Sequence, residues 1–244
     1  QGSFFKFILH NYTLTFLSKN IYILSYMKVK SDFKKNKYTL IKNVLDQKMC
    51  GFIYNYCKLR YMNLIDFKKE PWYRSKVDGI AGWIEDEQVK LAASWYSDPL
   101  FESLLIELMP LVAKISQRKL GPNYSYWRMY LENATMKKHI DRPACELSTT
   151  ICIGYDIDNL KDKSYKWPLY IKGKKQKKGT PVFMEPGDMI VYEGCELEHW
   201  RNKFIGNNHC QVFLHYNDLK KGKGKLFDDR PRLGLPDNYK YNAI

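Results

Sequence analysis

Three side chains in the middle of the chain have the types and spacing of a metal site. His139 and Asp141 flank Ile140, and residues two apart in an extended strand point to the same face. His199 follows 58 positions after Asp141, just beyond the strand-like run 188–192. Two imidazoles and one carboxylate are the ligand set that binds Fe(II) and leaves other coordination positions open. The sequence therefore predicts an iron site at His139, Asp141 and His199.

The segments around these ligands resemble a known enzyme family. The matching motifs are His139-Ile-Asp141, Trp167-Pro-Leu-Tyr170, Glu185-Pro-Gly-Asp188 and Glu198-His199-Trp-Arg201. They are similar to the 2-oxoglutarate/Fe(II)-dependent dioxygenases, specifically the prolyl-4-hydroxylase-like branch, over roughly Leu40 to Asn217. The resemblance implies a double-stranded β-helix, or jelly roll, that holds Fe(II) and uses 2-oxoglutarate and O₂ as co-substrates. It implies a hydroxylase that releases succinate and CO₂, with no catalytic residue beyond the metal ligands.

The far carboxylate of 2-oxoglutarate needs a cation or hydroxyl groups, because an unpaired buried carboxylate is costly. Members of the family usually have Arg or Lys nine or ten residues after the last metal histidine, where this chain has Asn208 and His209. Arg201 is the first candidate to replace that residue, since it shares a strand face with His199 and its guanidinium suits a carboxylate. His209 and Gln211 are further candidate donors.

Three more residues are candidates for ligand contacts. Tyr130 lies nine residues before His139 and matches the strand tyrosine that contacts the co-substrate in the family. Arg142 directly follows Asp141, and Arg128 lies on the preceding predicted strand. Both arginines are therefore candidate substrate-binding residues, and an ordinary surface charge is the alternative for each.

Composition bounds the class of protein without naming a partner. With 244 residues, 45% of them hydrophobic and 15% aromatic, the chain suits a β-rich globular fold with a substantial core. Its formal charge of +14 would favour nucleic acid, an anionic surface or an acidic substrate, but a general enrichment in lysine is the preferred explanation of the charge. Six cysteines without a Cys-x-x-Cys spacing argue against a zinc ribbon or a redox pair and predict a cytoplasmic protein.

The domain prediction divides the chain into an extension and one domain. Residues 1–26 are expected to be an N-terminal extension, either a cloning remnant or upstream sequence. Their longest uncharged run, the 12 residues 7–18, is too short to span a membrane. Residues 27–244 are expected to form a single 2-oxoglutarate/Fe(II) oxygenase domain of the α+β class, mainly β. It has a helical buttress over about 40–121, a jelly-roll core over about 122–217 and an irregular C-terminal tail.

The buttress is predicted to contain two helices, and the core many short strands. Asn43 is expected to cap the first helix, whose apolar positions, Phe52 among them, recur at helical spacing. The second helix is expected to begin at Asp98-Pro99 and to stop at Gly121-Pro122. Short strands that close on themselves give a barrel or jelly roll. The candidate strands are Tyr124–Leu131, Leu147–Tyr155, Leu169–Ile171, Met189–Tyr192, His199–Arg201 and Cys210–Tyr216.

The sequence leaves three functions open. The leading one is a hydroxylase acting on a peptidyl, prolyl-type residue or on a small molecule, and the positive charge leaves room for an anionic substrate. The second is a nucleic-acid demethylase of the same fold, which is less favoured because the Arg-x-Asn-x₅-Arg signature of that branch is absent after His199. The third is a metal-binding jelly roll without catalysis, favoured by the missing basic residue at position 209. No membrane partner is expected.

Overall fold

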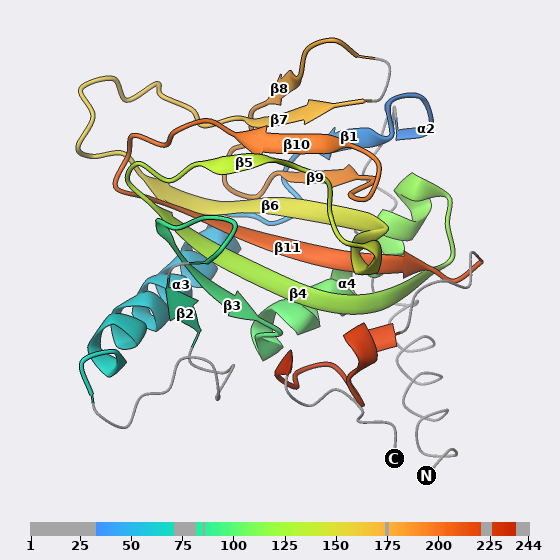
Figure 1. Cartoon of the computed structure of the whole chain (residues 1–244), viewed down its shortest axis with the longest axis horizontal. Helices are drawn as coiled ribbons and strands as arrows, with labels where there is room; N and C mark the ends of the chain where they lie inside the picture. The colour runs from blue at the N-terminus through green and yellow to red at the C-terminus, as the bar shows by residue number, and fades with distance from the viewer. Residues whose placement is uncertain (1–32, 71–81, 85, 174–175, 221–225, 238–244) are drawn as a thin grey trace. The chain divides into compact units, whose positions relative to one another are not determined.

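Two antiparallel β-sheets form the core of the protein (Figure 1). The computed structural model describes residues 33–70, 82–84, 86–173, 176–220 and 226–237, so the predicted N-terminal extension, residues 1–26, lies outside the described part. The larger sheet has the strand order β1-β9-β6-β11-β4-β3-β2, and the smaller one has the order β5-β10-β7-β8. The mainly β architecture predicted from the sequence is confirmed.

The described part of the chain contains eleven strands, with two long helices, α3 and α4, before β4. The strands are β1 (Tyr38–Ile41), β2 (Trp83–Ile84), β3 (Ala92–Tyr96), β4 (Leu120–Leu131), β5 (Met136–His139), β6 (Leu147–Asp156), β7 (Leu169–Lys172), β8 (Thr180–Val182), β9 (Met189–Tyr192), β10 (Glu198–Arg201) and β11 (Asn208–Asp218). The helices are α2 (Phe33–Asn36), α3 (Gln47–Phe67), α4 (Pro99–Ser116) and the short 3-10 segments η1 (Pro143–Cys145) and η2 (Leu226–Asp229). Each of the six predicted strands is present, five of them longer by one to four residues at one or both ends.

The side chains of the large sheet alternate between two environments, as a pleated strand requires. On β4, Trp127 packs against Phe101 of α4, whereas its neighbour Arg128 lines a cavity on the opposite face. Between the sheets lies an apolar core whose buried members include Tyr130, Met136, Cys152, Trp167, Ile171, Ile190, Tyr192 and Phe204. The jelly roll thus has one face covered by helices and one face that encloses a mixed apolar and polar interior.

A tight turn leads into β9 and orients the strand. Asp188 donates its backbone N–H to Glu185 O at 2.9 Å, and Gly187 has a φ of +92°, a conformation that glycine adopts without strain. A Cβ at Gly187 would also overlap the carbonyl of Leu45. Asp188 closes the turn by accepting from the backbone of Glu185 at 2.8 Å. The Pro-Gly-Asp sequence is therefore explained by the turn it forms.

The first helix begins later than predicted and buries a different face. Asn43 adopts a left-handed φ of 54°, and the capping residue is Asp46, whose side chain accepts from Met49 N. The buried positions of α3 are Cys50, Ile53, Cys57 and Leu64. Phe52 is 64% exposed, so the prediction that it belongs to the core face is wrong. Apolar side chains occur on all faces of α3, so their spacing in the sequence did not identify which face is buried.

The second helix begins as predicted but ends earlier. Asp98 caps α4 by accepting from Leu100 N, and Pro99 occupies its first turn. The helix ends at Ser116 because Gln117 adopts a left-handed φ of 55° and donates to Ala113 O. Gly121 and Pro122, expected to stop the helix, instead lie in β4. None of the helices in the described part of the chain has the length and apolarity needed to cross a membrane.

The C-terminal tail is attached through buried charges. Arg230 donates to the carboxylate of Glu102 on α4 at 2.8 Å, and both side chains are almost fully buried. Asp228 accepts two hydrogen bonds from Arg142 and one from Tyr96. This segment therefore reaches from the helical side of the large sheet to the loop that follows β5.

We expect truncation of two adjacent residues of α3 to have very different effects on stability. Ile53→Ala should lower the free energy of unfolding by about 2–5 kcal/mol, because Ile53 is 3% exposed and its loss leaves a cavity. Phe52→Ala should change it by less than about 0.5 kcal/mol. Urea unfolding of both variants measures the difference. Equal losses would show that Phe52 is covered in solution.

Candidate metal centre

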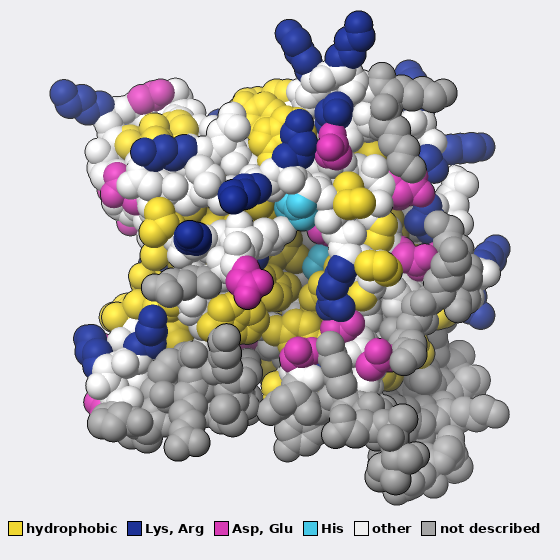
Figure 2. All heavy atoms as spheres, in the orientation of Figure 1, with side chains coloured by type: hydrophobic (Ala, Val, Ile, Leu, Met, Phe, Trp, Pro, Cys, Tyr) yellow, Lys and Arg dark blue, Asp and Glu magenta, His cyan; other side chains and the backbone are white. Residues whose placement is uncertain are grey.

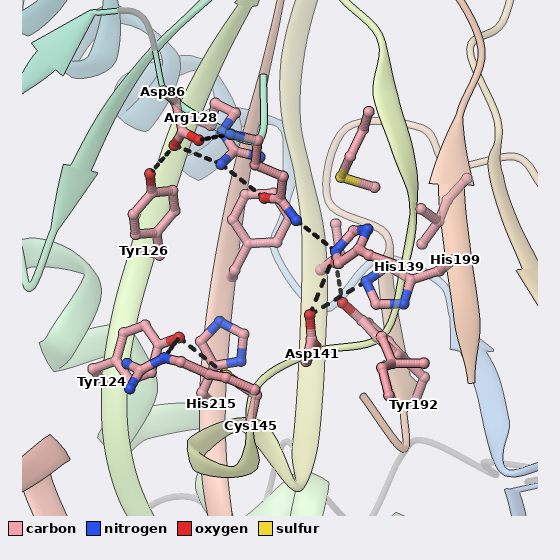
Figure 3. A pocket seen from close by; sticks show the side chains of 17 residues that line it. Asp86, Tyr124, Tyr126, Arg128, His139, Asp141, Cys145, Tyr192, His199 and His215 are labelled. Atoms are coloured by element: carbon pink, nitrogen blue, oxygen red, sulfur yellow. Dashed lines mark hydrogen bonds and ion pairs between the residues drawn. The ribbon is translucent and has the colours of Figure 1, made fainter. Parts of the chain in front are cut away.

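The structure brings His139, Asp141 and His199 together. His139 and His199 are directly opposite each other on the antiparallel strands β5 and β10, with ring centroids 4.2 Å apart. Asp141 Oδ1 lies 3.7 Å from His139 Nε2 and 3.4 Å from His199 Nε2 (Figure 3). The three possible ligand atoms all lie within 4.8 Å of one another. A single ion can therefore contact all three.

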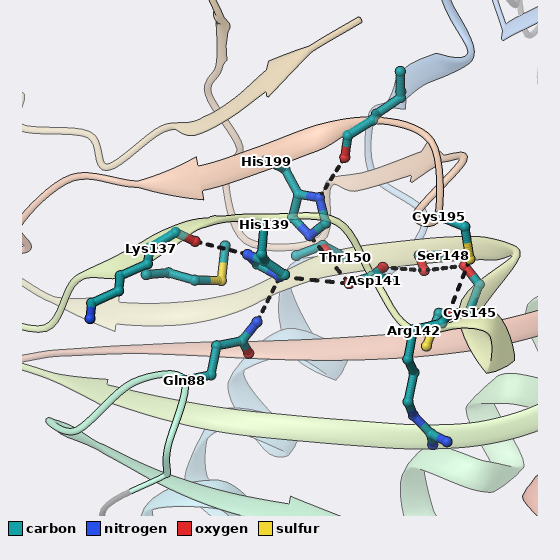
Figure 4. Close-up of polar contacts among 12 residues, drawn as sticks. Gln88, Lys137, His139, Asp141, Arg142, Cys145, Ser148, Thr150, Cys195 and His199 are labelled. Atoms are coloured by element: carbon teal, nitrogen blue, oxygen red, sulfur yellow. Dashed lines mark hydrogen bonds and ion pairs between the residues drawn. The ribbon is translucent and has the colours of Figure 1, made fainter. Parts of the chain in front are cut away.

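Hydrogen bonds to backbone carbonyls fix the tautomers of both imidazoles. His139 Nδ1 lies 2.8 Å from Lys137 O (Figure 4), and His199 Nδ1 lies 3.0 Å from Leu197 O. A carbonyl only accepts, so each Nδ1 carries the proton and each Nε2 keeps a lone pair. Gln88 Nε2 lies 2.6 Å from His139 Nε2, as expected if that nitrogen accepts. Such bonds orient metal-ligating histidines.

The environment keeps the carboxylate charged and His139 neutral. Burial would raise the pKa of Asp141, but its contacts with His199, His215 and Ser148 outweigh burial, and the pKa lies well below its usual value. Burial, together with neighbouring His199, lowers the pKa of His139. Metal ligands must be deprotonated to bind. Asp141 and His139 are therefore in the protonation states that bind a divalent transition metal.

Position 194, next to Asp141, has room only for glycine. Asp141 N donates to Gly194 O at 2.9 Å. A Cβ on Gly194 would overlap Asp141 Oδ2, Ser148 Oγ and the carbonyl of Cys145. The turn between β9 and β10 thus packs its bare glycine backbone against the carboxylate and limits where that carboxylate can lie.

The triad opens into a cavity of about 330 Å³. Figure 2 shows the hollow on this face, with histidine side chains inside it and hydrophobic side chains along its walls. One wall is aromatic, with Tyr124 and Tyr126 from β4 and Phe213 from β11, and His215 lies beside them (Figure 3). Such a cavity can hold a flat or cyclic group next to the metal ligands.

Both arginines predicted as substrate contacts line this cavity. Arg128 is buried and donates to Asp86 Oδ2 at 2.7 Å. Arg142 donates to both carboxylate oxygens of Asp228, at 2.9 and 2.7 Å. Each guanidinium is thereby paired with a carboxylate, and its role toward a substrate stays a prediction.

The residues predicted to hold the co-substrate lie deeper, outside the lining of this cavity. Arg201 is 2% exposed and donates to Trp167 O at 2.8 Å and to Gln211 Oε1 at 2.7 Å. Burial lowers the pKa of Arg201, and burial beside Arg201 lowers that of His209 well below its usual value. The buried Tyr130 hydroxyl accepts from Arg128 at 3.3 Å. Arg201, Gln211 and His209 are thus close together, whereas Tyr130 is bonded on the Arg128 side.

Sequence reasoning missed several residues of the site. Gln88 precedes β3, a strand of only five residues that was not predicted. Ser148 lies in a predicted strand, at a position two residues from Thr150, which lines the cavity. The alternation of Tyr124, Tyr126 and Arg128 along one strand was the available signal for the aromatic wall.

Comparison with known proteins supports the fold. No family model matches the chain, and no curated protein matches its sequence. Among solved structures, a Pseudomonas putida prolyl-4-hydroxylase is 13% identical and aligns with 77% of this chain and 95% of its own, with a TM-score of 0.52. HygX from Streptomyces hygroscopicus, with nickel and 2-oxoglutarate bound, is 10% identical and aligns with 86% of this chain and 91% of its own, with a TM-score of 0.54.

A third solved structure also aligns with most of this chain. A 2OG-Fe(II) oxygenase family oxidoreductase from Burkholderia pseudomallei is 12% identical and aligns with 76% of this chain and 86% of its own, with a TM-score of 0.51. At these identities the likeness shows a shared fold. The predicted jelly-roll architecture, of the kind found in 2-oxoglutarate/Fe(II) oxygenases, is therefore confirmed.

The buried His215 gives the metal-free protein a defined acid sensitivity. Burial lowers its pKa from 6.5 to about 4. Between these values the unfolded chain binds a proton that the folded protein does not, so stability falls as the pH falls. His215→Phe removes this titrating group. The free energy of unfolding of the variant, relative to that of the wild type, should therefore rise by about 3 kcal/mol as the pH is lowered from about 7 to about 4. Urea titrations of both proteins at several pH values measure this change. A difference in unfolding free energy that does not vary with pH would contradict the lowered pKa of His215.

Proposed function

We propose that this protein is a 2-oxoglutarate- and Fe(II)-dependent dioxygenase that hydroxylates its substrate with release of succinate and CO₂. The observation that carries the proposal is the convergence of His139, Asp141 and His199 within 4.8 Å at the wall of a cavity. The jelly-roll fold shared with 2-oxoglutarate/Fe(II) oxygenases supports it.

The metal ligands in this proposal are His139, Asp141 and His199. Bound Fe(II), together with 2-oxoglutarate and O₂, would supply the oxidising power that converts a substrate C–H bond into C–OH. The chain supplies the setting for that chemistry. The two Nδ1–H bonds to carbonyls hold the imidazoles in their binding tautomers, and the cavity positions a substrate carbon and excludes water.

Arg201 is proposed to bind the far carboxylate of 2-oxoglutarate. Three buried arginines lie in the described structure, and Arg128 and Arg230 each form an ion pair with a buried carboxylate. Arg201 has no such pair among the described residues. Its Nε, together with Gln211 Nε2 and His209 Nδ1, also lacks a hydrogen-bond partner there. A buried cation beside unsatisfied polar atoms is costly until an anion binds.

The substrate is proposed to be a peptide or a small molecule. A prolyl hydroxylase from Trichoplax adhaerens with this fold has a hypoxia-inducible-factor peptide bound, and one HygX structure has hygromycin B bound. In this chain the cavity arginines are already paired with carboxylates, so the cavity does not require an anionic substrate. We place the protein in the cytoplasm, and its six free cysteines support a reducing compartment.

A metal-binding module without catalysis is the second candidate. It is favoured by one observation: Arg201, Tyr130 and His209 do not line the described cavity beside the triad. In that case the protein would bind metal but would not consume 2-oxoglutarate.

Succinate production tests the proposal. The protein is loaded anaerobically with Fe(II), given 2-oxoglutarate and exposed to air, and succinate is measured. We expect slow turnover that His199→Ala abolishes without unfolding the protein, because one metal ligand is lost and no core is removed. Glu198→Gln, on the same strand but pairing with Lys172 on the surface, should retain it. Iron binding without succinate, and without binding of 2-oxoglutarate, would support the module instead.

Replacing Arg201 tests the co-substrate site separately. Arg201→Met should raise the concentration of 2-oxoglutarate needed for half-maximal turnover by about 10- to 100-fold, the loss of a charged hydrogen bond. Fe(II) affinity should stay unchanged, because Arg201 does not contact the triad. Isothermal titration with 2-oxoglutarate measures the same loss without turnover. An unchanged requirement would assign the carboxylate contact to His209 or to another residue.

A further inference from the structure

Ser148 and His215 lie directly behind Asp141, and neither has yet been given a role in binding the metal. Ser148 Oγ is 2.8 Å from Asp141 Oδ2 (Figure 4) and 3.0 Å from His215 Nδ1. Ser148 is fully buried and His215 nearly so. The two residues are register partners on the neighbouring strands β6 and β11, so the sheet itself sets their distance.

The directions of these two hydrogen bonds follow from the chemistry of the groups. Asp141 would bind a metal as a carboxylate, and a carboxylate only accepts hydrogen bonds. The single hydroxyl proton of Ser148 must therefore point to Asp141 Oδ2. His215 Nδ1 must then donate to Ser148 Oγ. His215 thus prevents Ser148 from turning its proton elsewhere, for example to Cys145 O at 3.4 Å.

The hydrogen bonds from His215 to Ser148 and from Ser148 to Asp141 involve only one of the two carboxylate oxygens of Asp141. The other oxygen faces the two histidines. Oδ2 accepts from Ser148, while Oδ1 is the oxygen that lies near both His139 Nε2 and His199 Nε2. We propose that Ser148 and His215 are positioning residues that hold Asp141 as a one-oxygen ligand of the metal. The proposal rests on the metal centre proposed above and adds the control of its carboxylate.

The packing around the pair supports a fixed geometry. The His215 ring lies against Tyr124, with centroids 4.5 Å apart, so it cannot swing away from Ser148 without displacing that ring. On the other side, the bare backbone of Gly194 closes the space next to Asp141 Oδ2 and Ser148 Oγ. The carboxylate is therefore confined by a hydroxyl on one oxygen and by backbone beside it.

A one-oxygen carboxylate has a consequence for the ligands that must bind beside it. If Asp141 could turn and bind the metal through both oxygens, it would occupy an additional coordination position. A bidentate co-substrate needs two adjacent positions, and O₂ needs a third. Losing the Ser148 hydroxyl should thus weaken metal binding and change the number of ligand atoms around the metal.

The experiment uses Co(II), whose visible absorption reports coordination number, titrated into the full-length protein. Ser148→Ala should raise the Co(II) dissociation constant by about 10- to 100-fold, the usual effect of removing a group that orients a metal ligand, and should shift the absorption spectrum. Ser148→Thr keeps the hydroxyl and should restore both. His215→Phe keeps the ring packing against Tyr124, removes the donor and should shift the spectrum in the same direction as Ser148→Ala.

Ser125→Ala is the matched control, because Ser125 is also a fully buried strand serine and its hydroxyl has no partner among the described residues. It should leave Co(II) binding and the spectrum unchanged. A dissociation constant and spectrum of Ser148→Ala equal to those of the wild type would overturn the proposal. If Ser148→Ala does not fold, His215→Phe decides: a wild-type spectrum in that variant would overturn it.

Failure of the metal centre itself gives a different result. If the wild type and His199→Ala bind Co(II) equally, the triad is not the metal site and the proposed function fails. If His199→Ala loses Co(II) while Ser148→Ala retains it with an unchanged spectrum, only the positioning role fails. Turnover is not needed for either conclusion.

Discussion

The pairing of β10 with β5 is the constraint on which the candidate site depends. It sets His199 directly opposite His139, and the chain then turns so that Asp141 follows two residues later. A slip of one residue in this register would move His199 to the outer face of the sheet, where Trp200 now lies, and no side-chain adjustment could restore the site. The neighbouring elements oppose such a slip. Asp141 is bonded to the backbone of Gly194 in the turn before β10, and Trp200 stacks on Tyr170 of β7.

Buried charge is distributed unevenly around this site. Arg128 and Arg230 are each paired with a buried carboxylate, and these two pairs join a loop to β4 and the C-terminal tail to α4. Pairs of this kind fix geometry more than they stabilise, since desolvation offsets much of their attraction. Arg201 differs because it is bonded only to a carbonyl and an amide in the described structure. An interior that satisfies its other arginines but leaves this one with neutral partners is suited to receive an anion.

The sequence predicted the fold class and the candidate metal ligands from patterns of residues, and the structure confirms the fold class and places the three candidate ligands together. His-x-Asp needs only the period of a strand, and six predicted strands matched the structure. The capping residue of α3 and its buried face were predicted wrongly, because apolar residues surround that helix and only tertiary packing selects Ile53 over Phe52. Ser148 and Gln88 had no signal of their own. Gln88 contacts His139 from a loop 51 residues earlier in the chain, and Ser148 contacts Asp141 because the chain turns back between β5 and β6. A single sequence does not reveal such contacts.

The central position of β11 also governs when the protein can fold during synthesis. β4 and β6 do not pair with each other; both pair with β11, which begins about 50 residues after β6 ends. At ribosomal rates of about 5–20 residues per second, β6 waits roughly 3–10 seconds for this partner, and β4, which ends earlier, waits longer. During that time their edges are available to other chains. The order of the strands thus leaves the inner edges of β4 and β6 unpaired in the nascent chain until β11 has been translated.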